Sequence, residues 1–324
     1  MRAIVVSNAK SLRTQYFMVA GRDVGVSVQF VTYDDLLAHP EHYADALVKL
    51  EPEEYPDVFD FDEYSALVQK YIQLLKQTDK LNLHFLNSPA AILCSLDKQF
   101  CKQCLHGKVN VTPMWEKTPQ NVGELLQRLD EKPHGVFIKP RFGSGAGGVV
   151  ALRRHPKQKT TVAYTALTAA NGKITNTRRI NRFSTRKDID TIVEAVLKSE
   201  AVVEDWVVKD SFEGEGYDLR VVCMFGVMQH VVVRCSKGVI TNLHLNNNAK
   251  TIDILQLSAE CLAEIARQSL EATRLMGLNY SGVDVLIAKG TATPYIIEVN
   301  GQGDHIYQDI FAGNEIYKRQ IKTT

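Results

Sequence analysis

GVDVLIA at residues 282–288 and YIIEVNG at residues 295–301 form the part of this 324-residue sequence that decides its fold. Both runs are short and rich in β-branched residues, and a brief polar stretch separates them. Such runs predict two antiparallel strands joined by a tight turn, and we centre this hairpin near Thr291.

The hairpin register brings two acidic residues together. Counting outward from the centre, Asp284 lies opposite Glu298, and Gly282 lies opposite Asn300. Because side chains alternate along a strand, Asp284, Glu298 and Asn300 share one face. A solvated strand face is the simple alternative, but carboxylates embedded in apolar, buried runs need a partner such as a metal ion. Two carboxylates and an amide oxygen suit Mg²⁺ that is held jointly with phosphate oxygens.

A glycine-rich hairpin is predicted earlier in the chain, in VFIKPRFGSGAGGVV at residues 136–150. We expect a strand at 136–139, a turn at 141–148 and a second strand at 149–152. No helix follows the turn, so neither the Walker A motif nor the GxGxxG fingerprint fits. Such a turn is often only a turn, but glycine lets the backbone approach a phosphate, and Lys139 adds a positive charge. The candidate phosphate-binding residues of the turn are Gly143, Ser144, Gly145, Gly147 and Gly148.

The rest of the chain alternates strand-like and helix-like segments. Short β-rich runs at 3–6 and 26–32, separated by a helix-length stretch, predict a βαβ unit that opens an α/β lobe. The acidic, proline-containing segment 51–62 is expected to be a loop. We further expect helices at about 63–80, 95–107 and 258–276, and strands at 202–208, 221–233 and 239–245.

Composition and charge describe an ordinary globular chain. The apolar fraction is 45% and the charged fraction is 23%. The formal net charge of +1 does not indicate a protein that binds nucleic acid through a general excess of positive charge. The apolar run at 3–6 is too short for a signal peptide or a membrane span. Six cysteines suit a reducing compartment, and the lone CxxC of Cys101 and Cys104 is interpreted as part of a helix. We therefore expect a cytoplasmic protein with no nucleic-acid or membrane partner.

Taken in order, these motifs resemble the ATP-grasp superfamily, and in particular the branch of ribosomal protein S6 glutamate ligase and glutathione synthetase-like enzymes. The resemblance covers about residues 96–304. It implies nucleotide-binding lysines at Lys98, in LDKQF, and at Lys139. It also implies that the VVEDWVV strand contacts adenine through Glu204, Asp205, Trp206 and Val207.

Further matches imply the residues that carry the chemistry. EGYDLRVVC resembles the family's acid-x-Arg strand, with Asp218 in the nucleotide site and Arg220 as a catalytic residue. VVVRCSKGVITNLH resembles the ligase branch and implies active-site roles for Arg234 and Asn242. Guanidinium groups suit a transferred phosphoryl group because they bind its oxygens in a fork. The implied metal positions are Asp284, Glu298 and Asn300, with Mg²⁺ as the ion and Mn²⁺ as an alternative.

The resemblance implies an N-terminal α/β lobe over residues 1–91, followed by an ATP-grasp domain over residues 92–324. Two α+β subdomains, at about 92–203 and 204–324, would clasp ATP between them. The implied reaction joins a carboxylate to an amine through an acyl phosphate and releases ADP and phosphate. We expect an amino acid, a peptide or a related small carboxylate as substrate, and we leave open a thiol nucleophile and a homodimer. The alternatives are a phosphotransferase on the same fold and a nucleotide-binding regulatory protein without turnover.

Three segments depart from this pattern or add to it. After Asn300 the sequence reads GQGDHIYQDIF where the ligase branch has a small-residue-Pro-Gly turn, and Asn246 and Asn247 replace a glycine pair. Both changes spare the nucleotide-handling residues and indicate a different substrate. A basic edge precedes the adenine strand and contains Arg178, Arg179, Arg182, Arg186 and Lys187. A solvated edge is the favoured interpretation, and guidance of an acidic peptide or another anionic substrate is the alternative.

Overall fold

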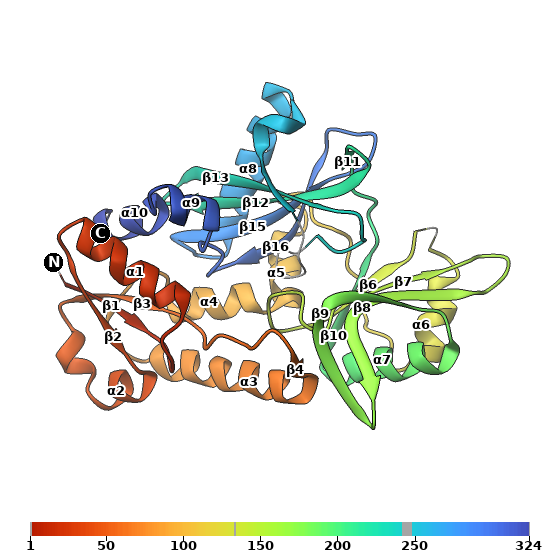
Figure 1. The fold of residues 1–324 in the computed structure, drawn as a ribbon, viewed down its shortest axis with the longest axis horizontal. Coiled ribbons are helices and arrows are strands. Elements are labelled where there is room, and N and C mark those ends of the chain that lie inside the picture. The colour runs from red at the N-terminus through yellow and green to blue at the C-terminus, as the bar shows by residue number, and fades with distance from the viewer. Residues whose placement is uncertain (1, 133, 242–247, 324) are drawn as a thin grey trace.

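The computed structural model describes residues 2–132, 134–241 and 248–323, which build three sheets. The N-terminal sheet lies at one end of the elongated molecule and a six-stranded sheet at the other (Figure 1). The third sheet lies above the centre, with the last helices of the chain beside the first (Figure 1). Among the described residues, no helix combines the length and the apolar character that crossing a membrane requires.

The N-terminal sheet is parallel, in the order β2-β1-β3-β5. Strands β1 and β3 are almost wholly buried because helices and the rest of the protein cover both faces, which explains their near-continuous apolar sequence. Ser11 begins α1 with a capping box, and Asp60 caps α3 through its carboxylate. The elements are β1 (Arg2–Val6), α1 (Leu12–Asp23), β2 (Ser27–Val31), α2 (Tyr33–Ala38), η1 (Pro40–Tyr43), β3 (Ala46–Leu50), α3 (Phe61–Thr78) and β5 (His84–Phe85).

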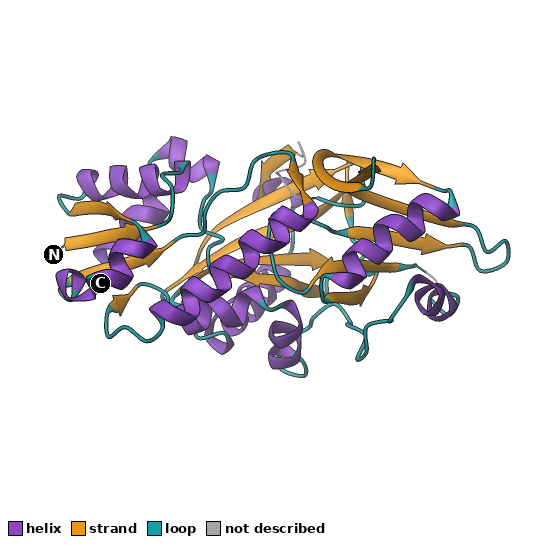
Figure 2. Ribbon diagram, turned by 90° about the horizontal axis from the view of Figure 1, so that it is seen from below, coloured by secondary structure: helices purple, strands orange, loops and turns teal. Residues whose placement is uncertain are grey.

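The six-stranded sheet is antiparallel, in the order β10-β6-β7-β8-β9-β4. Its core packs Leu125, Ile138, Leu152 and Val193 together. Seen from below, α3 and α7 lie in front of the strands (Figure 2). The elements are β4 (Phe59–Asp60), α6 (Val122–Leu129), β6 (Val136–Pro140), β7 (Val150–Arg154), β8 (Thr161–Ala170), β9 (Lys173–Phe183), α7 (Arg186–Lys198) and β10 (Ala201–Asp205).

The third sheet follows the order β14-β13-β12-β15-β16, and β11 pairs with β12. Helices α4, α5 and α8 share its core, while α10 returns to pack against α1 through Tyr317 and Phe17. The elements are α4 (Pro89–Leu96), α5 (Lys98–Leu105), β11 (Ser211–Phe212), β12 (Glu215–Met224), β13 (Val227–Ser236), β14 (Asn248–Thr251), η3 (Ile252–Leu255), α8 (Ala259–Leu275), β15 (Tyr280–Ile287), β16 (Pro294–Asn300), α9 (Tyr307–Ala312) and α10 (Glu315–Lys322).

Both predicted hairpins are confirmed. Asp284 pairs with Glu298 and Gly282 with Asn300, with a bulge immediately after Asp284. The glycine-rich hairpin is antiparallel, with Val136 opposite Leu152. The opening βαβ unit and the helix before β15 are also present.

Other elements differ from the prediction. The strand expected at 221–233 is wrong: β12 and β13 form a hairpin that turns at Phe225 and Gly226, both with positive φ. The helix expected at 95–107 is two helices, because the Asp97 carboxylate accepts from two backbone N–H groups and starts α5. Residues 239–241 form no strand, and the rest of the strand expected at 239–245 lies outside the described residues. The long β8–β9 hairpin was not predicted, since its Thr, Asn and Arg content hides the alternation.

Candidate active site

A cavity opens to solvent between the six-stranded sheet and the third sheet, and the space within it, open solvent at its mouth included, is about 850 Å³. Its wall combines apolar side chains with convergent charged groups, the composition of a small-molecule site. The predicted site residues that line it are Lys98, Lys139, Gly143, Ser144, Gly147, Glu204, Asp205, Val207, Asp218, Arg234, Asp284 and Glu298.

Other predicted residues do not line this cavity, namely Gly145, Gly148, Trp206, Arg220 and the predicted metal ligand Asn300. Asn242, together with Asn246 and Asn247, lies outside the described residues. Sequence reasoning missed several lining residues: Thr112, Phe137, Lys209, Ile240, Thr241, Leu286 and Ile297. The strand period could have found Phe137, which is two residues before Lys139 on β6 and so shares its face.

Glu204 on β10 lies at the centre of a buried charge cluster. Its carboxylate is 3.0 Å from Lys139 Nζ and 3.4 Å from Lys102 Nζ, and it accepts a 2.7 Å hydrogen bond from Thr112 Oγ1. Burial alone would raise the pKa of the Glu204 carboxyl, but the two lysines and Thr112 lower it to about 2. Glu204 is therefore ionised at neutral pH and orients Lys139 at the cavity wall.

Lys98, the first residue of α5, contacts both the glycine-rich turn and Glu298 of β16. Its Nζ donates to the Gly143 carbonyl oxygen at 2.6 Å and lies 3.6 Å from Glu298 Oε1. Asp97, which starts the helix, also binds the Arg141 guanidinium at 2.6 and 2.8 Å. The beginning of α5 thus holds the first residues of the glycine-rich turn.

The glycine-rich turn packs against aromatic rings of α3. A Cβ atom at Gly143 would lie 2.4 Å from the Tyr64 hydroxyl oxygen, and one at Gly147 would lie 2.8 Å from Tyr64 Cζ. The Tyr64 hydroxyl donates to the Ser144 carbonyl and accepts from the Ser144 N–H, both at 2.9 Å. At these positions glycine is required by the approach of an aromatic side chain, a cause that the sequence does not reveal. Gly145, by contrast, faces open space.

Arginines and acids alternate across the strands of the third sheet. Arg220 lies opposite Asp284 and binds it at 2.6 Å, and Arg234 lies opposite Asp218 and binds it at 2.6 Å. Arg234 also reaches Asp284 at 3.2 Å. Burial would raise the pKa of the Asp218 carboxyl, but Arg234 and Lys209 lower it to about 2. These pairings keep Asp218 and Arg234 charged within a largely buried site.

The residues present fit a Mg²⁺ ion that is shared with a nucleotide. Asp284 and Glu298 face each other across β15 and β16, and the bulge places both Ile297 and Glu298 on the cavity wall. Across residues 2–132, 134–241 and 248–323 there is no group of three or more His, Cys, Asp or Glu side chains that could hold a metal ion. One or two carboxylates completed by phosphate oxygens is the arrangement in which Mg²⁺ usually binds.

The predicted basic edge is divided between β9 and α7. Arg178 forms an ion pair with Asp57 of the acidic segment 51–62, and β4 pairs with β9 beside it. Arg186 pairs with Asp190 along α7. At least part of this edge is therefore balanced within the protein.

Comparisons with known proteins agree with this geometry. The family model described as an ATP-grasp domain matches residues 185–302. A probable alpha-L-glutamate ligase of Hydrogenovibrio crunogenus is 25% identical over 311 residues, or 92% of this chain and 86% of that protein. A probable alpha-L-glutamate ligase of Marinomonas sp. is 24% identical over 312 residues, with the same 92% and 86% shares.

Solved structures share the fold over nearly the whole chain. The D-cycloserine synthetase DcsG aligns with a TM-score of 0.63 at 13% identity, over 99% of this chain and 98% of that one. The D-alanine–D-alanine ligase of Bacillus anthracis, complexed with ATP, aligns with a TM-score of 0.56 at 14% identity, over 99% and 94%. The chain therefore has the ATP-grasp fold, residues 185–302 match the ATP-grasp domain model, and over 92% of its length it is similar to probable alpha-L-glutamate ligases.

Proposed function

We propose that this protein is an ATP-dependent carboxylate–amine ligase that activates its substrate as an acyl phosphate and releases ADP and phosphate. The observation that carries the proposal is the convergence of three cations, Lys98, Lys139 and Arg234, with the carboxylates of Asp284 and Glu298 around one cavity. Such a site gathers positive charge around a triphosphate and keeps two carboxylates for a metal ion.

The adenine end of the cavity is the end that β6 and β10 form. Phe137, Val149 and Leu286 supply apolar surface to the cavity, and Glu204, Asp205 and Val207 line it at the end of β10. An adenine ring fits a slot of this kind because apolar faces enclose it while edge groups fix its orientation. Lys139, fixed by Glu204, then lies beside the phosphates.

The reacting end of the cavity holds the fixed cations. Mg²⁺, when bound by Asp284, Glu298 and phosphate oxygens, would neutralise the charge that develops on the transferred phosphoryl group. Arg234 and Arg220 share Asp284 as a partner, so their guanidinium groups are oriented before any substrate arrives. Preoriented donors of this type stabilise the oxygens of a tetrahedral intermediate when an amine attacks the acyl phosphate.

The substrate pair that we propose is a carboxylate of amino-acid or peptide character and an amine, with glutamate as the first amine to test. Curated relatives that cover 92% of the chain are named probable alpha-L-glutamate ligases, which supports glutamate. The macrocyclase MdnC, whose structure was solved with a precursor peptide, has the same fold at a TM-score of 0.60. Peptides with free carboxylates therefore belong in the same screen.

The test is an ADP-release screen with MgATP, a panel of amino acids and peptides, and hydroxylamine as a trap for acyl phosphate. Wild-type protein should form ADP and a hydroxamate in equal amounts, and Glu298→Ala should lower the rate by about 100-fold or more. Glu131→Ala, which changes an exposed carboxylate that does not line the cavity, is the matched control. A stable phosphorylated product, or ATP binding without turnover on every substrate, would overturn the proposal.

A further inference from the structure

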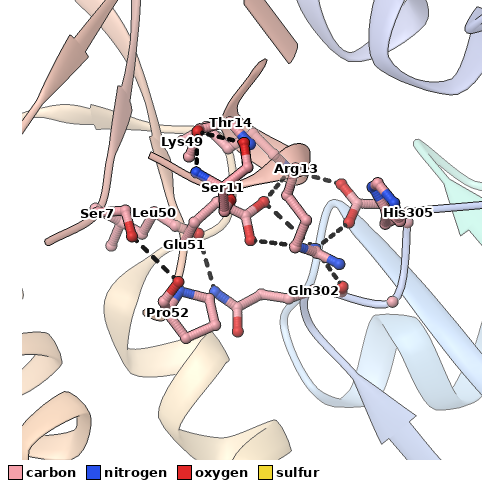
Figure 3. A network of polar contacts seen from close by, with 12 residues as sticks. Ser7, Ser11, Arg13, Thr14, Lys49, Leu50, Glu51, Pro52, Gln302 and His305 are labelled. Atoms are coloured by element: carbon pink, nitrogen blue, oxygen red, sulfur yellow. Dashed lines mark hydrogen bonds and ion pairs between the residues drawn. The ribbon is translucent and has the colours of Figure 1, made fainter. Parts of the chain in front are cut away.

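The 301–304 segment, GQGD, leaves β16 and lies against the N-terminal sheet (Figure 3). It meets the carboxyl ends of β1 and β3, neighbouring strands whose chain connections run in opposite directions. In open parallel sheets the crevice at such a switch point is where ligands usually bind. In this protein two of its own side chains, Gln302 and Asp304, occupy that place.

Gln302 is fixed by three hydrogen bonds to the N-terminal lobe. Its Nε2 donates to the Leu50 carbonyl at 2.9 Å and contacts the Tyr71 hydroxyl at 2.6 Å. Its backbone carbonyl oxygen accepts a hydrogen bond from Arg13 Nη2 at 2.5 Å, as Figure 3 shows. Both the backbone and the side chain of this residue are therefore held by residues from the first quarter of the chain.

Asp304 is held by two cations that come from the N-terminal lobe. Its Oδ1 accepts from Arg13 Nη2 at 2.7 Å, and its Oδ2 accepts from Lys49 Nζ at 2.5 Å. Glu51 supplies a second negative charge to this cluster, and its carboxylate lies 2.7 Å from Arg13 Nε. The side chains of Lys49, Glu51 and Asp304 have no solvent exposure. Removing one member would leave a buried charge unpaired, so the four residues act as a unit.

The other side of the segment contacts the strands of the active site. A Cβ atom at Gly282 would lie 2.3 Å from the Gly303 carbonyl oxygen, so these two glycines pack backbone to backbone. That same oxygen accepts from Arg220 Nη1 at 3.4 Å, and Arg220 holds Asp284. The Gly303 N–H donates to the Asn300 carbonyl at 3.1 Å. Through these two hydrogen bonds the segment fixes the positions of Arg220 and Asn300.

We infer that Arg13, Lys49 and Gln302 are positioning residues for the ligase reaction. They fix the 301–304 segment, and this segment in turn fixes Arg220 and Asn300 near the carboxylates of Asp284 and Glu298. The N-terminal lobe thus takes part in the chemistry through a segment of the C-terminal sheet docked into its crevice. The role in turnover rests on the proposed function, whereas the docking itself does not.

The test compares Gln302→Ala and Arg13→Gln with Arg2→Gln, a control arginine that pairs with Asp45 within the N-terminal lobe. We expect kcat for ADP release to fall by about ten-fold in the first two variants, because Gln302→Ala removes both side-chain hydrogen bonds of Gln302 and Arg13→Gln removes the charge-assisted bonds of Arg13. The Kd for ATP should stay within about two-fold, since none of these residues lines the cavity. Exchange of the Gly301 and Gly303 amide hydrogens should become about ten-fold faster.

Gln302 is uncharged and half-buried, so its alanine variant remains informative if Arg13→Gln fails to fold. Variants with a lower Tm but wild-type kcat would reduce the network to a structural role and overturn the inference. Unchanged amide exchange at Gly301 and Gly303 would overturn the docking as well. If wild-type protein turns over no carboxylate, the proposed function fails by itself, and faster exchange in the variants would still support the docked segment.

Discussion

Glu204→Gln should make the stability of this protein less sensitive to acid. The Glu204 carboxylate lies between Lys139 and Lys102 and accepts from Thr112, with its side chain 3% exposed. These partners lower its pKa from 4.5 to about 2. A group whose pKa is depressed on folding contributes stability above its unfolded pKa, and the contribution is lost as the pH falls through the folded pKa.

The size of the effect follows from the two pKa values. The difference between 4.5 and about 2 corresponds to about 3 kcal/mol of free energy of unfolding at neutral pH. Between pH 6 and pH 3 about 2 kcal/mol of that contribution should disappear, because the unfolded chain takes up the proton first. Glutamine keeps the shape of the side chain but cannot titrate.

The assay is urea unfolding of wild-type protein and Glu204→Gln across this pH range, with Glu131→Gln as an exposed control. Wild type should be the more stable protein at pH 6, by about 3 kcal/mol, and this advantage should shrink to about 1 kcal/mol at pH 3. An advantage that stays constant with pH would refute the assignment of a paired, ionised Glu204.

Three further outcomes test the geometry of the cavity. Tyr64→Phe removes the hydroxyl that binds both backbone groups of Ser144, so amide exchange in the glycine-rich turn should become about ten-fold faster, which mass spectrometry would detect. Gly147→Ala should raise the KM for ATP because the new Cβ would lie 2.8 Å from Tyr64 Cζ, and combining it with Tyr64→Ala should restore much of the loss in steady-state assays. Asp218→Asn takes from Arg234 its 2.6 Å partner, so the free energy of unfolding in urea should fall by about 3 kcal/mol, and a change below about 0.5 kcal/mol would contradict the buried pair.

The sequence predicted those parts of the site whose partners are close in the chain. The register of Asp284 with Glu298 follows from symmetry about one turn, and the β6–β7 hairpin from a Gly-rich interruption between two apolar runs. Strand alternation is a local property, so a single sequence carries enough information to place these side chains on one face.

Contacts between distant segments were not predictable in the same way. Arg220 and Asp284 are 64 residues apart and meet only because β12 lies beside β15, a strand order that no local pattern encodes. Tyr64 and Ser144 are 80 residues apart, and they meet only because α3 packs into the core of the sheet whose turn carries Ser144. Lys49 offered one signal, since a lysine inside the apolar run ALVKL needs a buried acid, but the sequence does not say that the acid is Asp304.

The most direct test of the acyl-phosphate mechanism is isotope transfer from the substrate carboxylate to inorganic phosphate. If the carboxylate attacks the γ-phosphorus and the amine then displaces phosphate, one carboxylate oxygen leaves with that phosphate. With a substrate labelled in both carboxyl oxygens with ¹⁸O, we predict that each phosphate released together with the amide carries a single ¹⁸O atom, as measured by mass spectrometry. Amide formation with unlabelled phosphate would contradict the acyl-phosphate route.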